Sequence, residues 1–176
     1  MSITEATTRP SLKQLALGDI NHELNTTRKL LERVPEAHLD WKPHEKSMTL
    51  GGLALHVATI PFWLIRILEA DFFDLATSTR NPPPGSVQEI LDAFEERVAA
   101  MRQALDSADD AALMQPWQLR RGEQVLQTMP RLAVIRAMGI NHMIHHRAQL
   151  SVYLRLLDVP LPPMYGPTAD EQPTFG

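Results

Sequence analysis

The sequence predicts an all-α protein, a four-helix bundle with a short irregular or hairpin excursion before the last helix. Two observations support this prediction. Four long segments repeat apolar residues at intervals of three and four, which is the period of one helix face. The connections between these segments are modest in length, as in a bundle of neighbouring helices. The chain has 176 residues, so we expect a single domain over residues 1–176 with a sizeable core.

The first two helices are bounded by proline-containing segments. The first is expected over about residues 11–34, with Gly18 as a weak point. Residues 35–47 contain two prolines and mixed charges, and we expect an ordered loop there. The second helix is expected from about residue 49 to residue 75. Pro61 lies inside it and should kink it, because proline cannot donate a backbone hydrogen bond.

The last two helices have clearer beginnings. Ser86 followed by Glu89 forms a capping-box pattern, and the apolar stripe of a third helix follows it. The fourth helix is expected to begin at Met129 or Pro130 and to run to about Asp158, where several prolines prevent its continuation. Between these helices, the segment around Gly122 alternates weakly and predicts the hairpin or extended excursion. The tail after the fourth helix is expected to pack on the bundle.

Composition excludes several classes of protein. The chain has no cysteine, so a metal must be held by histidine, carboxylate or backbone oxygen. The formal net charge of −4 is spread along the chain, and without a basic stripe we expect no nucleic-acid partner. The N-terminus does not resemble a secretory signal, and no run of about 18 apolar residues is visible, so we expect no membrane span and a cytoplasmic protein.

Two histidines in the fourth helix have the spacing of metal ligands. His142 and His146 are four residues apart, so both imidazoles project from one helix face. We expect this face to be apolar and to point into the bundle, since it also carries Leu150. His145 should lie to one side of the pair. Arg147 should occupy a wetter face, as should Arg136 and Arg155.

A third histidine, His56, lies on the apolar stripe of the second helix and completes a set of three imidazoles. Three neutral imidazoles suit zinc, nickel or ferrous iron and leave coordination positions for water or substrate. The alternative is that these histidines merely hydrogen-bond inside the core, because a lone histidine on an apolar stripe is more often a core residue than a ligand. The remaining three, His22, His38 and His44, are expected at the surface or in loops.

Other catalytic motifs are absent. Met143 follows His142 where a zinc protease would have glutamate, and neither a G-x-S-x-G elbow nor a phosphate-binding loop occurs. A di-iron bundle would need paired E-x-x-H motifs, which the chain lacks. No catalytic residue is therefore assigned. His145 is a weak candidate for a base, and Gln149 is a weak candidate for a group supporting a ligand.

The segments GGLALHVATIPFW and NHMIHHRAQLSVYLRLLDVPLPPMYGPTADE resemble the DinB/YfiT-like family, which is unrelated to the DNA polymerase of the same name. The resemblance spans nearly the whole chain, and its most specific part is a helix-two histidine combined with H-x-x-x-H-R-x-Q-L. Ala148 stands where the family commonly has glycine. The resemblance implies a four-helix bundle of that type, a three-histidine metal site at His56, His142 and His146, and a homodimer. Relatives include thiol transferases and a thiol-dependent isomerase.

These observations predict a metal-dependent enzyme acting on a small molecule, either a thiol S-transferase using a low-molecular-weight thiol or a hydrolase. A non-enzymatic metal-binding or stress-related bundle protein is the alternative. We expect an open metal site, with Trp41 and Tyr165 forming the rim of its entrance. Extra apolar positions on the second and fourth helices are expected to serve the homodimer, for example Phe62, Val134, Ile144 and Val152.

Overall fold

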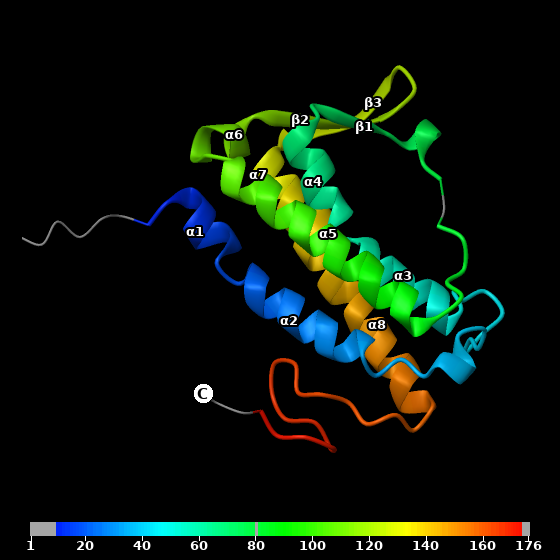
Figure 1. The fold of residues 1–176 in the computed structure, drawn as a ribbon. Helices are drawn as coiled ribbons and strands as arrows, with labels where there is room; N and C mark the ends of the chain where they lie inside the picture. Colours follow the sequence, from blue (N-terminus) through cyan, green and yellow to red (C-terminus); the bar gives the residue numbers. More distant parts are fainter. Residues whose placement is uncertain (1–9, 80, 174–176) are drawn as a thin grey trace, which may run out of the picture.

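The computed structural model describes residues 10–79 and 81–173, and most of this chain is helical. The long helices run lengthwise beside one another in Figure 1, and neighbouring helices contact each other in pairs. In chain order these stretches are α2 (Ile20–Leu31), α3 and α4 (Leu50–Thr59 and Phe62–Glu69), α5 (Val87–Ser107), and α7, η3 and α8 (Arg131–Val134, Ile135–Asn141 and His142–Leu156). Short elements lie at the ends, namely α1 (Leu12–Leu17), η1 (Glu36–His38), η2 (Leu75–Thr77) and α6 (Asp110–Met114).

Side-chain caps fix three of the helix beginnings. Ser11 and Gln14 form a capping box before α1, Thr49 accepts a hydrogen bond from the amide of Gly52 at α3, and Ser86 accepts one from the amide of Glu89 at α5. Each cap satisfies a backbone N–H that has no partner inside its helix. The predicted beginnings of the first three helices are therefore confirmed.

The first predicted helix is in fact two. The chain turns at Gly18 and Asp19, so that α1 and α2 are separate helices, and α2 ends at Leu31. Glycine is a poor helix former, which makes this the natural place for the break. A Cβ at Gly18 would lie 2.6 Å from the carbonyl oxygen of Gln14, so the turn also needs a residue without a side chain.

The second predicted helix is also divided, and it is shorter than expected. It breaks around Pro61, as proline predicts, and it ends at Glu69 rather than Leu75. Residues Phe72–Asp74 instead form a strand, β1, which pairs in parallel with β2 (Pro116–Arg121). The apolar residues that suggested more helix serve this strand, where Phe73 packs against Trp63.

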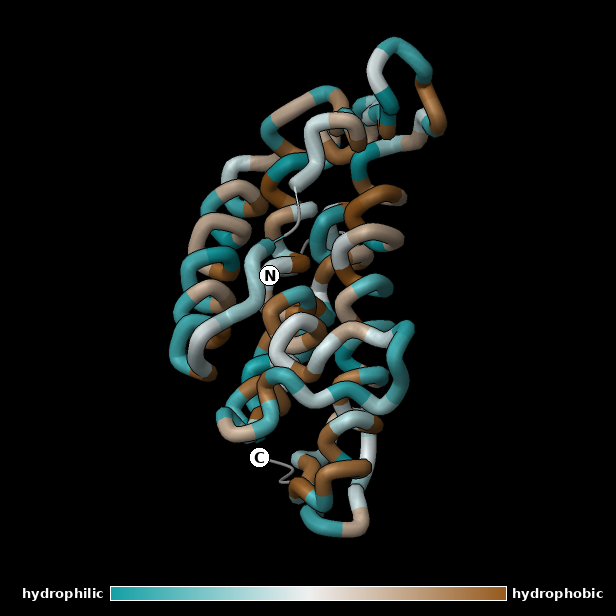
Figure 2. The backbone as a smooth tube through the Cα atoms, turned by 90° about the vertical axis from the view of Figure 1, so that its right-hand side faces the viewer, coloured by the Kyte–Doolittle hydropathy of each residue, from teal (hydrophilic) through white to brown (hydrophobic). Residues whose placement is uncertain are grey.

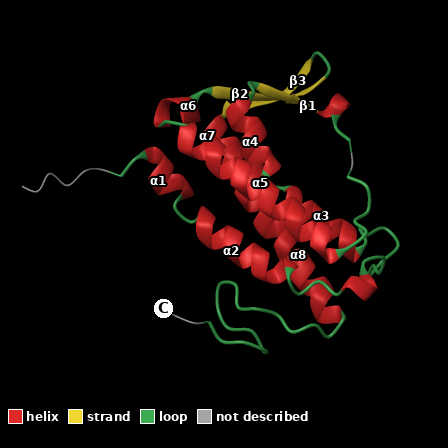
Figure 3. Cartoon of the chain, viewed as in Figure 1, coloured by secondary structure: helices red, strands yellow, loops and turns green. Residues whose placement is uncertain are grey.

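A three-stranded sheet at one end of the molecule makes the all-α prediction wrong in part (Figure 3). Its order is β1-β2-β3, and β2 pairs antiparallel with β3 (Gln124–Pro130). The predicted hairpin excursion is thus confirmed. Gly122 makes its turn with φ +59°, a left-handed conformation that glycine adopts without strain.

The fourth helical stretch contains a π-helical segment that the sequence did not predict. Residues Ile135–Asn141 are wound as a π-helix between α7 and α8. Gly139 lies within it, and a Cβ there would be 2.4 Å from Cδ1 of Leu64. Glycine therefore lets this segment approach α4 closely. The stretch ends at Leu156, two residues before the predicted Asp158.

Apolar side chains from every long helix form one core. Figure 2 shows hydrophobic and hydrophilic positions alternating along the helical turns, as expected of helices with one buried face. Taken together, α3 and α4 (Leu50–Glu69) are long and apolar enough to cross a membrane by length and composition, but 61% of the 18-residue apolar window is buried inside the protein. This burial is typical of a core helix, and the stretch is weak evidence for a membrane span.

Candidate metal centre

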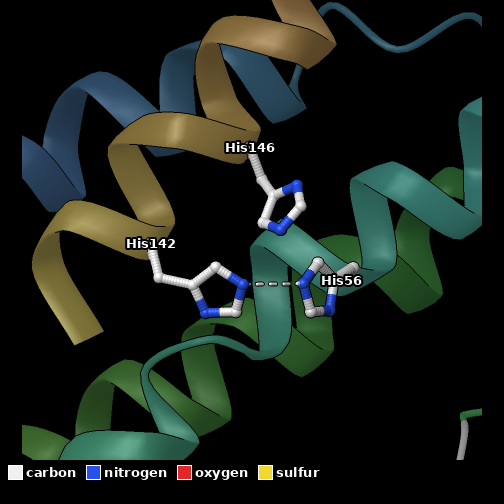
Figure 4. A group of neighbouring side chains, drawn as sticks. All are labelled: His56, His142 and His146. Carbon is white, nitrogen blue, oxygen red and sulfur yellow. Dashed lines mark hydrogen bonds between the residues drawn. The ribbon is translucent and has the colours of Figure 1, made fainter. Parts of the chain in front are cut away.

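Three histidine side chains converge between α3 and α8 (Figure 4). His56 comes from α3, and His142 and His146 lie one turn apart on α8. One ring nitrogen from each lies within 4.8 Å of the other two. Within residues 10–79 and 81–173, no carboxylate shares this cluster. The structure thus brings together the three predicted residues, and metal ligation by them stays a prediction.

The spacing of the nitrogens suits a transition metal. The Nε2 atoms of His56 and His142 are 3.3 Å apart. Two nitrogens that each lie about 2.0–2.1 Å from a tetrahedral ion are about 3.3 Å apart, so this pair matches zinc-type coordination. The same separation would also fit a hydrogen bond between the rings, in which one nitrogen donates to the other.

The Nδ1 atoms of His142 and His146 each have a hydrogen-bond partner. Nδ1 of His142 lies 3.3 Å from the carbonyl oxygen of Met138, and Nδ1 of His146 lies 2.7 Å from Oε1 of Gln149. Both oxygens can only accept, so each Nδ1 carries the proton and each Nε2 of a neutral ring keeps its lone pair. Lone pairs that face a common centre are the arrangement a metal ion requires.

The three imidazoles are held in their neutral form. Burial is the largest cause that lowers the pKa of His56 from 6.5 to about 4, and the nearby rings of His146 and His142 contribute the rest of this lowering. Burial is also the largest cause that lowers the pKa of His142 and of His146, despite the hydrogen bonds from each to its oxygen partner. Neutral imidazoles are the form that binds metal, so protons compete weakly for this site near neutral pH.

The site histidines were predicted to project from the apolar face of α8 into the bundle, and they lie at the edge of its buried face. The buried positions of this helix are Met143, Arg147, Leu150 and Leu154, whereas both site histidines are half-buried. Arg147 was predicted on a wetter face, and this was wrong, because only 1% of its surface is exposed. A buried arginine is unusual and requires a partner.

That partner is Glu23 on α2, which sequence analysis missed. Nη2 of Arg147 lies 2.6 Å from Oε2 of Glu23, and Nη1 donates to the Glu23 carbonyl and to Oγ1 of Thr27. The hydroxyl of Tyr165 contacts both carboxylate oxygens of Glu23 at 2.8 Å and lies 2.9 Å from Nη2 of Arg147. The network locks α8 against α2, and it confirms that the tail packs on the helices. In the sequence, the signal was an acidic residue at an apolar-stripe position of α2.

Trp41 and Tyr165 were predicted to form the rim of the entrance, and this stays a prediction. Trp41 makes an edge contact with Tyr153, their ring centroids being 5.8 Å apart, whereas Tyr165 is held in the Arg147 network. His145 is exposed beside the cluster, with its ring 4.8 Å from that of His146. The remaining histidines are exposed, as predicted, namely His22, His38 and His44.

A surface hollow of about 710 Å³ lies elsewhere, between α1, α6 and α7. Its lining is mainly apolar and includes Leu15 and Met114. The two charged residues in it, Asp19 and Arg136, pair with each other. None of the three clustered histidines lines it, so we place the chemistry at the histidines and not in this hollow.

The fold and the cluster together define a class: mostly helical proteins with a small sheet and a three-histidine group able to hold a metal ion. Comparison with known proteins identifies the family. The model of the DinB family matches residues 11–174, so the chain belongs to the DinB family.

Relatives and solved structures agree with this membership. The chain is 29% identical over 154 residues to the uncharacterized protein YrdA of Bacillus subtilis strain 168, covering 88% of each chain. A DinB-like protein from Bacillus cereus ATCC 10987 has a similar fold, with a TM-score of 0.73, 23% identity, and coverage of 90% of this chain and 100% of that one. The DinB-like protein YjoA from Bacillus subtilis gives a TM-score of 0.67 with 18% identity, covering 86% of this chain and 96% of that one.

Proposed function

We propose that this protein is a metal-dependent enzyme acting on a small molecule, with one divalent transition metal, such as zinc, nickel or iron, held by His56, His142 and His146. The observation that carries the proposal is the convergence of three ring nitrogens within 4.8 Å of one another. Three neutral imidazoles suit these metals, and the lowered pKa values of the rings favour that neutral form.

The ligand count supports an open site. A closed structural zinc site has four protein ligands, whereas catalytic sites keep a position for water or substrate. Three histidines form the cluster, and no acidic side chain joins them within the described part of the chain. His145 is adjacent to His146 in a helix, and its direction differs from that of His146 by about 100°, which turns it away from the shared centre.

The charge of the site favours an anionic ligand. Its three ligands are neutral, and the carboxylate of Glu23 is already paired with Arg147, so the positive charge of an ion would remain uncompensated. A divalent metal held there would stabilise the thiolate form of a thiol or lower the pKa of water. The chain contains no cysteine, so a thiol would have to come from the substrate. A thiol S-transferase or a hydrolase fits these requirements.

Elemental analysis of the purified protein tests the metal, with about one divalent ion per chain expected.

The open site is tested on the cobalt-substituted protein by titration with a small thiol, with the matching methyl thioether as the control. The thiol should change the visible absorption bands far more than the thioether does, because only the thiol can bind as an anion. Unchanged bands at saturating thiol, with the metal firmly bound, would contradict the enzyme proposal and favour a structural or sensing role. Removing the metal with a chelator should leave an enzyme folded and would unfold a metal-stabilised bundle.

The proposed enzyme is a homodimer in the cytoplasm. Of the apolar positions predicted to serve the interface, Val134 is instead buried in the core, whereas Val152 is 56% exposed. Light scattering at micromolar concentration should give about twice the chain mass of 19.8 kDa. A species at the mass of one chain would contradict the dimer without affecting the metal site.

A further inference from the structure

Gln149 is an exposed residue of α8 with a defined partner. It lies three residues after His146, one helical turn further along, and its Oε1 atom is 2.7 Å from Nδ1 of His146. This is the shorter of the two hydrogen bonds made by the Nδ1 atoms of the cluster, since the one from His142 to Met138 is 3.3 Å. An exposed glutamine ordinarily has only water as a partner, so this specific contact is unusual.

The helix itself explains the contact. Residues three apart lie on neighbouring positions of a helix face, so Gln149 can reach the imidazole of His146 without a change in the backbone. The contact sets the tautomer, because an amide oxygen accepts and the ring nitrogen must donate. With the proton on Nδ1, the nitrogen that remains available to an ion is Nε2 (Figure 4).

We propose that Gln149 is a positioning residue of the metal centre, which fixes the tautomer and the orientation of His146 so that its Nε2 lone pair faces His56 and His142. The carbonyl oxygen of Met138 plays the corresponding part for His142, by means of the backbone. The inference rests on the proposed function, because it assigns a role toward the same metal.

The chemical type of the supporting group gives this role a measurable signature. Many metal-binding histidines donate to a carboxylate, which raises the basicity of the ring and the affinity for the metal. Gln149 offers a neutral oxygen instead, so His146 is oriented without receiving a negative charge. Gln149→Glu should keep the acceptor and add charge, whereas Gln149→Leu removes the acceptor at nearly the same size.

The experiment measures the affinity for zinc by competition with a chromophoric chelator, for the full-length protein and these variants. Loss of a group that hydrogen-bonds to a metal ligand typically weakens metal binding by about 10- to 100-fold. For Gln149→Leu, the loss of zinc affinity should lie at or near the lower end of that range. Gln149→Glu should bind at least as tightly as the unmodified chain. The melting temperature of the metal-free protein should be the same for all, because residue 149 is exposed.

Ala148→Glu is the matched control for charge. Residue 148 is exposed and adjacent, but it projects in a different direction, so its carboxylate adds the same charge without facing Nδ1 of His146. If Ala148→Glu tightened binding as much as Gln149→Glu, long-range charge would explain the effect and the positioning role would be refuted. Unchanged affinity of Gln149→Leu, with zinc bound by the unmodified chain, would refute the positioning role alone. Absence of zinc binding by the unmodified chain would refute the proposed function as well.

A measurement without metal reads the tautomer directly. In nitrogen-15 NMR spectra of the metal-free protein at neutral pH, His146 should show a protonated Nδ1 and an unprotonated Nε2. Gln149→Leu should remove this preference, and Gln149→Glu should restore it. A purely structural contribution of Gln149 would leave the ring nitrogens unchanged, as would Ala148→Glu.

Discussion

His146 and Arg147 are neighbours in the sequence, yet they belong to two regions with opposite chemistry. Arg147 is buried, and its guanidinium donates hydrogen bonds to oxygen atoms of Glu23 and Thr27. The carboxylate of Glu23 also supplies the opposite charge. His146 is half-buried, and its free nitrogen faces two other imidazoles. A buried charge whose neighbours supply its hydrogen bonds needs no further ligand, whereas three ring nitrogens turned toward one another can hold a cation between them. The first region maintains the structure, and the second is suited to binding.

The largest effect on stability should come from disrupting the buried network around Arg147. Arg147→Ala leaves the carboxylate of Glu23 buried without its partner, and such losses typically cost about 3–5 kcal/mol of unfolding free energy. Urea denaturation of the metal-free protein measures this cost. Arg28→Ala, which removes the exposed contacts of Arg28 with Glu32 and Glu95, is the matched control and should change stability little. Equal stabilities for the two variants would mean that the buried network does not secure α8.

Substitution in the second region should act on metal and not on the fold. His142→Ala removes one of the three nitrogens, so zinc affinity should fall by more than the roughly 10- to 100-fold expected for an outer partner. His145→Ala removes an exposed imidazole next to the site and should leave the affinity unchanged. Equilibrium dialysis measures both. The assignment of the ligands would be wrong if His145→Ala released the metal and His142→Ala retained it.

A third substitution tests the π-helical segment that precedes His142. In Gly139→Ala, the added methyl group would overlap Leu64, and overpacking of this kind costs about 1–3 kcal/mol of unfolding free energy. The segment would move away from α4 and shift the histidines that follow it, so zinc affinity should fall together with stability. Gly122→Ala is strained locally but distant from α8, so it should lower stability without altering zinc affinity. A stable Gly139→Ala variant would show that close packing here is unimportant.

The smallest effect is the response of the metal-free protein to acid. The folded-state pKa of His56 is about 4, below its ordinary value of 6.5, so between these values the unfolded chain binds the proton and the folded chain does not. Unfolding therefore takes up protons, and stability contributed by this group is present above pH 6.5 and lost as the pH falls toward 4. Urea midpoints measured across this range should show the loss, and His56→Asn should reduce it. A midpoint independent of pH would contradict the lowered pKa.

Sequence patterns predicted the helical part of the fold because each long helix has an apolar stripe and several have a capping residue. They also predicted the three clustered histidines, because the four-residue spacing of His142 and His146 fixes a shared helix face and His56 lies on the apolar stripe of another helix. The sheet was only partly predictable. The hairpin around Gly122 has a local turn signal, but β1 pairs with a strand about 45 residues further along, and such pairing depends on tertiary contacts rather than on local pattern.

The orientation of α8 was predicted less well than its existence. A uniform helix from Pro130 onward would place Ile135 and His142 on one stripe, but the π-helical segment adds a wider turn between them. The buried face of α8 is therefore rotated toward Arg147, and the histidines move to its edge. Apolar periodicity assumes the regular α-helical turn, so it cannot show where a π-helical segment changes the face that the following residues occupy.

The contact between Arg147 and Glu23 also has a consequence for how the chain folds. These residues are 124 positions apart, and Tyr165, which bridges them, is 142 positions from Glu23. As the chain emerges from the ribosome, α2 is complete long before its charged partner exists. The carboxylate of Glu23 must therefore remain in water through most of synthesis, and it can enter the core only when α8 and the tail arrive. Desolvation of this one side chain is postponed to the final stage of folding, when the last helix docks.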